Sequence, residues 1–264
     1  MQKGALSMPK HRRIWNASVY EKYIREGRGC GSGLDYTPWI HVQDFASRGV
    51  VSRTKGMTTG RVHHLMSNNE LAYFYLLDWS DKVTDIREQY PLIDLERAVN
   101  IAWQAGIKYP TDKTSGYPYV LTCDFMVTTV DGMKARTIKA SSELSNLRVL
   151  EKLEIERRYW SEQRIDWKII TEHEIPYQRA RNIEWLYTAL FYESPDEAVQ
   201  NAMLRLLSSN KYSVIESARA IENEFCLTAG IGLQMFKHFV LNRAITVNLD
   251  TPLNLNMKGI VTEV

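Results

Sequence analysis

One stretch constrains the fold more than any other, the two β-prone runs on either side of Asp131-Gly132. Leu121–Val130 comes before this pair and Met133–Lys139 follows it. An Asp-Gly pair between two such runs is the strongest short-range signal for a β-hairpin. We therefore expect a central hairpin with Asp124 in its first strand and Lys139 near the end of its second.

A second carboxylate stands earlier in the chain, at the start of a predicted helix. Ser67-Asn-Asn-Glu70 before the apolar run Leu71–Trp79 matches a capping box, in which the Glu carboxylate bonds back to the amide of the N-cap residue. This role explains Glu70 by itself. An acid on a helix, an acid on a strand and a lysine on the next strand are also the parts of a metal-dependent nuclease site. The pattern alone leaves both roles open for Glu70.

The predicted second strand departs from the common form of such a site. Two residues before the lysine, where a second acid usually lies on the same strand face, this chain has Thr137, a neutral hydroxyl. Lone Asp and Lys residues on a hairpin are mostly surface groups. Judged as a pattern, Asp124 and Lys139 are therefore weak evidence for catalysis.

The charge is unevenly distributed along the chain. The net charge is +2, but residues 1–61 contain eleven Lys and Arg against four Asp and Glu. Such a segment predicts a local contact with a polyanion such as DNA, although a solvated basic arm explains it equally well. The candidate DNA-binding residues are Arg28, Arg53, Lys55, Arg61, His63 and His64.

The composition is that of a globular protein that buries a core, with 44% hydrophobic residues in 264. No apolar run is long enough to cross a membrane, and the basic N-terminus lacks the apolar region of a secretory signal. The cysteines, Cys30, Cys123 and Cys226, have neither disulfide-framework nor zinc-site spacing. They suggest a protein of a reducing cytoplasm.

The order of predicted elements changes near residue 172. Before it, helices, strands and the hairpin predict an α/β layer with a mixed sheet. A long helix is expected over 143–163, and its charged outer face, which includes Glu156, is expected to be solvated. After it, helices are expected over 182–192, 196–208, 214–224 and 228–243, then a β-like tail over 244–256. We predict domains at 1–172, with 1–16 flexible, and at 173–264, where two helices followed by a hairpin outline a winged helix.

Several strings resemble the TnsA family, the endonuclease subunit of heteromeric, Tn-seven-type transposases. The similarity extends in order from about Gly27 to Tyr187. It is carried by Gly27-Arg-Gly-Cys-Gly, Tyr36-Thr-Pro-Trp39, Gly60-Arg-Val-His-His-Leu65, Asn69-Glu-Leu-Ala72, Asp85-Ile-Arg-Glu-Gln-Tyr-Pro-Leu92, Thr122-Cys-Asp-Phe125, Leu150-Glu-Lys-Leu-Glu-Ile-Glu-Arg-Arg-Tyr-Trp160 and Asn182-Ile-Glu-Trp-Leu-Tyr187.

The resemblance implies a restriction-endonuclease-like N-terminal domain, a mixed sheet flanked by helices, and a mainly α, winged-helix-like C-terminal domain. It implies a Mg²⁺-dependent endonuclease, with Mn²⁺ as a substitute, that cuts the 5′ ends of a transposon beside a TnsB-type transposase and a TnsC-type AAA+ ATPase. The family's catalytic residues fall on Glu70, Asp124 and Lys139. Its metal ligands fall on Glu70, Asp124, Thr137 and the carbonyl of Ile138, and Thr137 departs from the family's glutamine.

Two other functions remain open from the sequence. The chain could be a non-catalytic DNA-binding or adaptor subunit with a degenerate nuclease fold, for which Thr137 is the best support. A free-standing restriction or repair nuclease is disfavoured, because the charged helix over 143–163 and the C-terminal helices suggest partners. The modest net charge predicts weak autonomous DNA binding with a shallow salt dependence.

Overall fold

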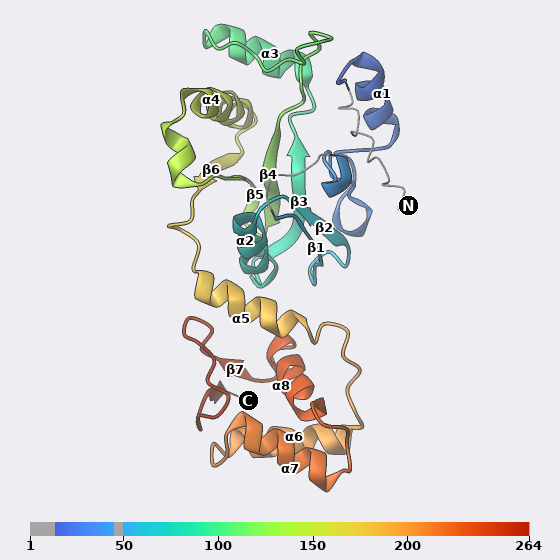
Figure 1. The fold of residues 1–264 in the computed structure, drawn as a ribbon, viewed down its shortest axis with the longest axis vertical. Helices are drawn as coiled ribbons and strands as arrows, with labels where there is room; N and C mark the ends of the chain where they lie inside the picture. Colours follow the sequence, from blue (N-terminus) through green and yellow to red (C-terminus); the bar gives the residue numbers. More distant parts are fainter. Residues whose placement is uncertain (1–13, 45–49, 264) are drawn as a thin grey trace, which may run out of the picture. The chain divides into compact units, whose positions relative to one another are not determined.

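The computed structural model describes residues 14–44 and 50–263. These residues form two compact units (Figure 1). The first unit is drawn from residues 1–46 and 85–169, and the second from residues 47–84 and 170–264. The expected flexible segment 1–16 lies outside the described residues except for positions 14–16. The predicted boundary after residue 172 stays a prediction.

The first unit is built on a four-stranded sheet in the order β3-β4-β5-β6 (Figure 1). The strands are β3 (Val83–Pro91), β4 (Thr122–Thr129), β5 (Gly132–Ile138) and β6 (Asp166–Ile170). Strands β4 and β5 are antiparallel, and Gly132 takes a φ of +117° at the turn between them. Glycine adopts this backbone conformation without strain. The predicted central hairpin is confirmed.

Two helices pack against this sheet and against each other, α3 (Leu95–Gln104) and α4 (Leu147–Glu162). Their apolar residues form one core with the hairpin, in which Ile101 of α3, Met126 of β4 and Ile155 of α4 are almost fully buried. Asn146 caps α4 by accepting a hydrogen bond from the amide of Arg148. The helix therefore begins later than the expected residue 143, after the 3₁₀ turn η3 (Ser141–Ser145).

A smaller aromatic core holds the N-terminal part of this unit. Helix α1 (Ala17–Arg25) carries Tyr23, which packs edge-on against Trp15 and Trp39. The indole of Trp15 donates a hydrogen bond of 2.8 Å to the carbonyl of Pro118. Two 3₁₀ turns follow α1, η1 (Gly33–Asp35) and η2 (Val42–Asp44).

In the second unit, β1 (Ser52–Lys55) pairs antiparallel with β2 (Val62–Leu65), which leads into α2 (Asn68–Asp78). Helix α2 packs against α5 (Tyr177–Tyr187). Asp78 joins these elements, since its buried carboxylate accepts hydrogen bonds from the amides of Met57 and Thr58 and from the hydroxyl of Tyr187. Helix α5 begins five residues earlier than the expected residue 182, so that boundary was wrong.

The rest of the second unit contains three helices and a short strand pair. Helices α6 (Glu197–Ser208), α7 (Val214–Glu224) and α8 (Ile231–Leu241) are followed by β7 (Thr246–Val247), which pairs antiparallel with β8 (Val261–Glu263). Helices α7 and α8 approach so closely that a Cβ at Gly232 would lie 2.6 Å from the Cα of Ala218. The order of elements matches the winged-helix outline, and that assignment stays a prediction.

None of the helices in the described ranges is long and apolar enough to span a bilayer. The three cysteines are unpaired thiols, two exposed and one, Cys123, buried.

Candidate active site

The hairpin places Asp124 and Lys139 beside each other where β4 and β5 enter the core. Asp124 directly precedes Phe125, which pairs with Arg136 in the register of the two strands. The Asp124 carboxylate is buried, and its Oδ2 accepts a hydrogen bond of 2.6 Å from the amide of Ile138. A strand-to-strand bond of this kind fixes the carboxylate rigidly against the second strand.

Lys139 completes a compact arrangement around Asp124. Its Nζ lies 3.5 Å from Oδ2 of Asp124 and donates a hydrogen bond of 2.9 Å to the carbonyl of Ile138. The side chain of Lys139 is 29% exposed and that of Asp124 is 11% exposed. The ammonium is therefore partly open to solvent while its acidic partner is nearly enclosed. The structure places Asp124 and Lys139 next to each other, as expected, and the backbone of Ile138 contacts both.

Thr137 is hydrogen-bonded to a carboxylate that comes from α4. Its hydroxyl donates a hydrogen bond to Oε1 of Glu156, and the indole of Trp167 on β6 donates another to the same oxygen over 2.9 Å. Glu156 is 5% exposed, and no lysine or arginine forms an ion pair with it among the residues described. The strand position that lacks an acid is thus bonded to an acid supplied by a helix.

Burial controls the charge of Glu156. The pKa of this carboxyl is raised to about 7, chiefly because burial removes its solvation. The bonds from Thr137 and Trp167 lower the pKa, the charge of Asp124 raises it and the charge of Lys139 lowers it. A buried acid coupled to a carboxylate and an amine is typical of functional sites.

The expectation that Glu156 lies on the solvated face of its helix was wrong. Leu153 and Trp160, three residues before it and four after it, are both buried, so Glu156 belongs to the buried stripe of α4. The helical spacing of these neighbours is the signal that could have identified it. The many charged residues of this helix made the buried stripe difficult to recognise in the sequence.

Glu70 lies in the second unit, where it caps α2. Ser67 is the N-cap and its hydroxyl oxygen accepts a hydrogen bond of 3.1 Å from the amide of Glu70. The Glu70 carboxylate accepts one bond from the hydroxyl of Ser67 and another, of 2.9 Å, from the amide of Met66. The capping role predicted for Glu70 is therefore present, although the carboxylate reaches the amide before the N-cap. Its catalytic role stays a prediction.

The oxygen atoms of the first unit suit a hard cation such as Mg²⁺, which prefers carboxylates, carbonyls and hydroxyls. Asp124 offers Oδ1, which accepts no hydrogen bond from the described residues, and Ile138 offers its carbonyl. Thr137 contributes a hydroxyl that is bonded to Glu156. No three His, Cys, Asp or Glu side chains cluster as a metal site within the described ranges, so neutral oxygens would have to complete any ligand set.

The candidate DNA-binding residues differ in their exposure. Arg53 and Lys55 on β1 are exposed. Arg28 is buried and donates hydrogen bonds to Glu26, Asp44 and the carbonyl of Trp39. Its charge is balanced by two acids within the fold.

The other three candidates lie on or next to β2. His63 is fully buried, shares a hydrogen bond of 2.7 Å with Thr59 and packs on Phe74, and Arg61 is buried as well, while His64 is half-buried. A DNA contact by any of the six stays a prediction, and Arg53 and Lys55 are the two whose exposure suits it best.

Comparison with known proteins decides the family. Residues 80–172 match the family profile described as TnsA-like endonuclease N terminal, and residues 174–249 match that of the TnsA endonuclease C terminal. The chain is also 38% identical to the transposon Tn7 transposition protein TnsA of Escherichia coli over 232 residues, which cover 86% of this chain and 84% of that protein. The chain belongs to the TnsA family.

Membership of the TnsA family makes this chain a transposon endonuclease subunit of the Tn7 type. The N-terminal match contains Asp124, Thr137, Lys139 and Glu156, so the arrangement described above lies within the endonuclease segment. Glu70 precedes residue 80, where that match begins. A mixed sheet flanked by helices agrees with a nuclease-like fold for this segment.

Proposed function

We propose that this chain hydrolyses one phosphodiester bond at each 5′ end of a transposon in a Mg²⁺-dependent reaction, for which Mn²⁺ substitutes. The observation that carries the proposal is the Asp124–Lys139 pair, a nearly enclosed carboxylate with an amine 3.5 Å away. Mg²⁺, when bound, would polarise the phosphate and lower the pKa of a water molecule. Asp124, the carbonyl of Ile138 and the hydroxyl of Thr137 would hold it, and Glu70 is the further ligand that the family resemblance implies.

The chain's own residues account for the remaining requirements of hydrolysis. Asp124 is fixed by the amide of Ile138, which orients its second oxygen without further reorganisation. The ammonium of Lys139 is available to orient the attacking water and to stabilise negative charge that develops on the phosphate. Pre-positioned groups of this kind reduce the reorganisation that the reaction requires.

The adaptor alternative draws on Thr137, which removes a carboxylate from the strand. Glu156 weakens that alternative, because it places a buried carboxylate one hydrogen bond from Thr137 and couples it to Asp124 and Lys139. A protein that kept the fold only as a scaffold would gain nothing from an ionisable group with so high a desolvation cost. We propose that Glu156 positions Thr137 through this hydrogen bond.

The proposed partners are transposon-end DNA, a TnsB-type transposase that cuts and joins the 3′ ends, and a TnsC-type AAA+ ATPase. The relative from E. coli is named as a transposition protein of Tn7, which supports a role within such an assembly. A winged-helix-like C-terminal domain would serve partner or DNA contact. We place the protein in the bacterial cytoplasm and at the nucleoid when it acts.

The decisive experiment measures nicks at the 5′ ends of a labelled transposon-end substrate with Mg²⁺, the partner transposase and its ATPase. Asp124→Ala and Lys139→Ala should each abolish 5′ nicks and leave the transposase's 3′ cuts intact. The matched controls on the same hairpin are Asp131→Ala, in the exposed turn, and Lys134→Ala on β5, and both should cut normally. Retained 5′ cleavage by the Asp124 variant would contradict the site. Absence of 5′ nicks with the native chain would favour the adaptor.

The two roles of Glu70 can be separated by Glu70→Gln. Glutamine also serves at this position of a capping box, so α2 and the melting temperature should be retained. The negative charge is lost, so 5′ cleavage should fall at least tenfold if Glu70 binds the cation. Normal cleavage by this variant would leave Glu70 with the capping role alone.

A further inference from the structure

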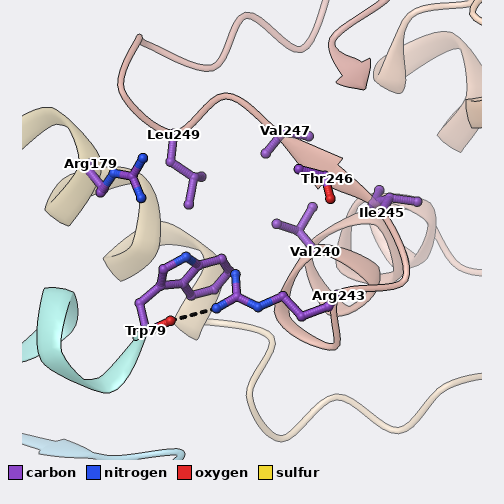
Figure 2. Close-up of a pocket in the computed structure, with 8 residues that line it drawn as sticks. All are labelled: Trp79, Arg179, Val240, Arg243, Ile245, Thr246, Val247 and Leu249. Carbon is purple, nitrogen blue, oxygen red and sulfur yellow. Dashed lines mark hydrogen bonds between the residues drawn. The ribbon is translucent and has the colours of Figure 1, made fainter. Parts of the chain in front are cut away.

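The second unit contains a cavity of about 180 Å³ that the nuclease chemistry does not use (Figure 2). It is lined by Trp79 after α2, by Arg179 of α5, and by residues from the end of α8 through β7 to Leu249. An apolar cavity of 150 Å³ is large enough to bind benzene. This cavity therefore has room for a medium-sized aliphatic side chain.

The walls and the rim of the cavity differ in chemistry. The walls include Val240, Val247 and Leu249, each no more than 7% exposed. Two arginines provide the polar groups, and their side chains are 37% exposed at Arg179 and 41% exposed at Arg243. Figure 2 shows the guanidinium of Arg179 on one side of the cavity and that of Arg243 over the indole of Trp79. A ligand that suits both parts carries an apolar group next to an anion.

Contacts within the chain fix both arginines and leave part of each guanidinium for a ligand. Arg243 stacks 3.5 Å above the ring of Trp79, and its Nη2 donates to the carbonyl of Trp79 over 2.6 Å and lies 3.5 Å from Asp81. Arg179 bonds Asp250 through Nε and Nη2. Among the described residues, Nη1 of each arginine has no hydrogen-bond partner. Arginines held in place lose less entropy when a carboxylate binds.

The chain itself provides an example of the chemistry that this site accepts. Leu249 lines the cavity, and the next residue, Asp250, forms a two-point ion pair with Arg179 at 2.7 and 2.8 Å. Within the chain, an aliphatic side chain thus already forms part of the cavity wall, and the acidic residue that follows it pairs with one of the two arginines. Arg243, on the other side, has no comparable carboxylate, because the side chain of Asp81 is 90% exposed and meets it only at 3.5 Å.

The charge of the surrounding chain argues against a nucleic acid as the ligand. The second unit, residues 47–84 and 170–264, contains thirteen Lys and Arg and fourteen Asp and Glu. Duplex DNA is bound by extended basic surfaces that neutralise several phosphates. Two arginines at the rim of an apolar cavity, in a unit without an excess of basic residues, match a peptide anchor instead. Trp and Arg are also the residues that most often dominate protein–protein interfaces.

We propose that this cavity binds a segment of a partner protein in which an aliphatic side chain is followed by an acidic one. The aliphatic side chain enters between Val240, Val247 and Leu249, and the carboxylate pairs with Nη1 of Arg243. The indole of Trp79 forms the floor beneath the arginine. This site is independent of the hairpin and of its chemistry.

The test uses the full chain and the capped dipeptide N-acetyl-Leu-Asp-amide as the probe. The indole signal of Trp79, assigned in a ¹H–¹⁵N correlation spectrum with Trp79→Phe, should shift in a saturable manner as the peptide is added. Arg243→Gln should raise the dissociation constant at least tenfold, because a charge-assisted hydrogen bond is lost. Arg181→Gln is the matched control, since this residue lies exposed on the same helix as Arg179, and it should bind normally.

Three further probes define what would overturn the proposal. N-acetyl-Leu-Asn-amide lacks the carboxylate and N-acetyl-Gly-Asp-amide lacks the aliphatic side chain, so both should bind at least tenfold more weakly. Inorganic phosphate that gave the same shift would show a simple anion site and refute the peptide assignment. Absence of any shift, or equal binding by Arg243→Gln with an unchanged spectrum elsewhere, would also refute it.

Discussion

The buried acid beside Thr137 makes a quantitative prediction about stability. Glu156→Gln keeps the size of the side chain and an oxygen that accepts bonds from Thr137 and Trp167, but it removes the ability to ionise. The pKa of Glu156 is raised from an ordinary value of 4.5 to about 7 by burial. A native state that holds the proton more tightly than the unfolded state becomes less stable as pH rises between these two values.

The size and sign of the effect follow from that shift. Below pH 4.5 both states are protonated, and the carboxyl has no effect on the free energy of unfolding. As pH rises the unfolded chain ionises first, so the native protein loses about 1 kcal/mol by pH 5 and about 3 kcal/mol by pH 8, since one pKa unit corresponds to 1.36 kcal/mol. Above pH 7 the loss is nearly complete. Glutamine avoids this loss, so the advantage of Glu156→Gln should grow by about 2 kcal/mol from pH 5 to pH 8.

Urea denaturation of both proteins at the two pH values, with a chelator present, measures this difference. Glu154→Gln on the same helix is the control, because Arg157 and Arg158 lower the pKa of Glu154 to about 2. Its carboxylate contributes stability that is present above pH 4.5 and lost only at lower pH, so its effect should be the same at pH 5 and pH 8. An advantage of Glu156→Gln that does not grow with pH would refute the argument that burial holds the proton on Glu156.

Three further predictions concern packing, a buried hydrogen bond and DNA. Gly232→Ala should destabilise the second unit by about 1–3 kcal/mol, because the new Cβ would meet Ala218. Asn201→Ala, at an exposed position on α6, should leave the stability unchanged. Equal urea midpoints for the two variants would contradict the close approach of α7 and α8. Tyr187→Phe should cost about 1.5–3 kcal/mol in the same assay, because Asp78 loses a bond of 2.6 Å; an unchanged midpoint would show that the bond contributes nothing. Replacing Arg53 and Lys55 with Gln should reduce the salt slope of DNA binding by about 0.9 per lost contact; a slope that stays the same would exclude both from phosphate contact.

Local signals in the sequence predicted the parts of the fold that depend on neighbouring residues. The hairpin follows from Asp131-Gly132 between two β-prone runs, and Ser67 with Glu70 marks the start of α2, because turns and caps are decided within a few residues. The start of α5 was missed, since its first turn is polar and follows Pro176. In this first turn, the polarity of the residues hardly differs between the buried and the exposed face of the helix.

Burial decided by distant contacts was harder to predict. The charge of Arg28 suggested DNA, but Asp44, sixteen residues away, accepts a hydrogen bond from it inside the fold. Glu156 was assigned to a solvated face, and only the packing of α4 against the hairpin shows which of the many charges on that helix is enclosed. The pairing of Asp124 with Lys139 was expected, whereas the bond from Thr137 to Glu156 needed the structure.

The antiparallel pairing of β4 with β5 also limits how this site can change during evolution. Side chains alternate between the two faces of a strand, so deletion of one residue between Asp124 and the turn would rotate Asp124 to the opposite face from its present neighbours. Deletion of a cross-strand pair such as Thr128 with Met133 would leave Asp124 facing the same residues. Insertions and deletions in this hairpin should therefore survive in pairs, or singly only with a bulge that restores the alternation. The number of residues in the hairpin can therefore change, but the face of the strand on which Asp124 lies cannot.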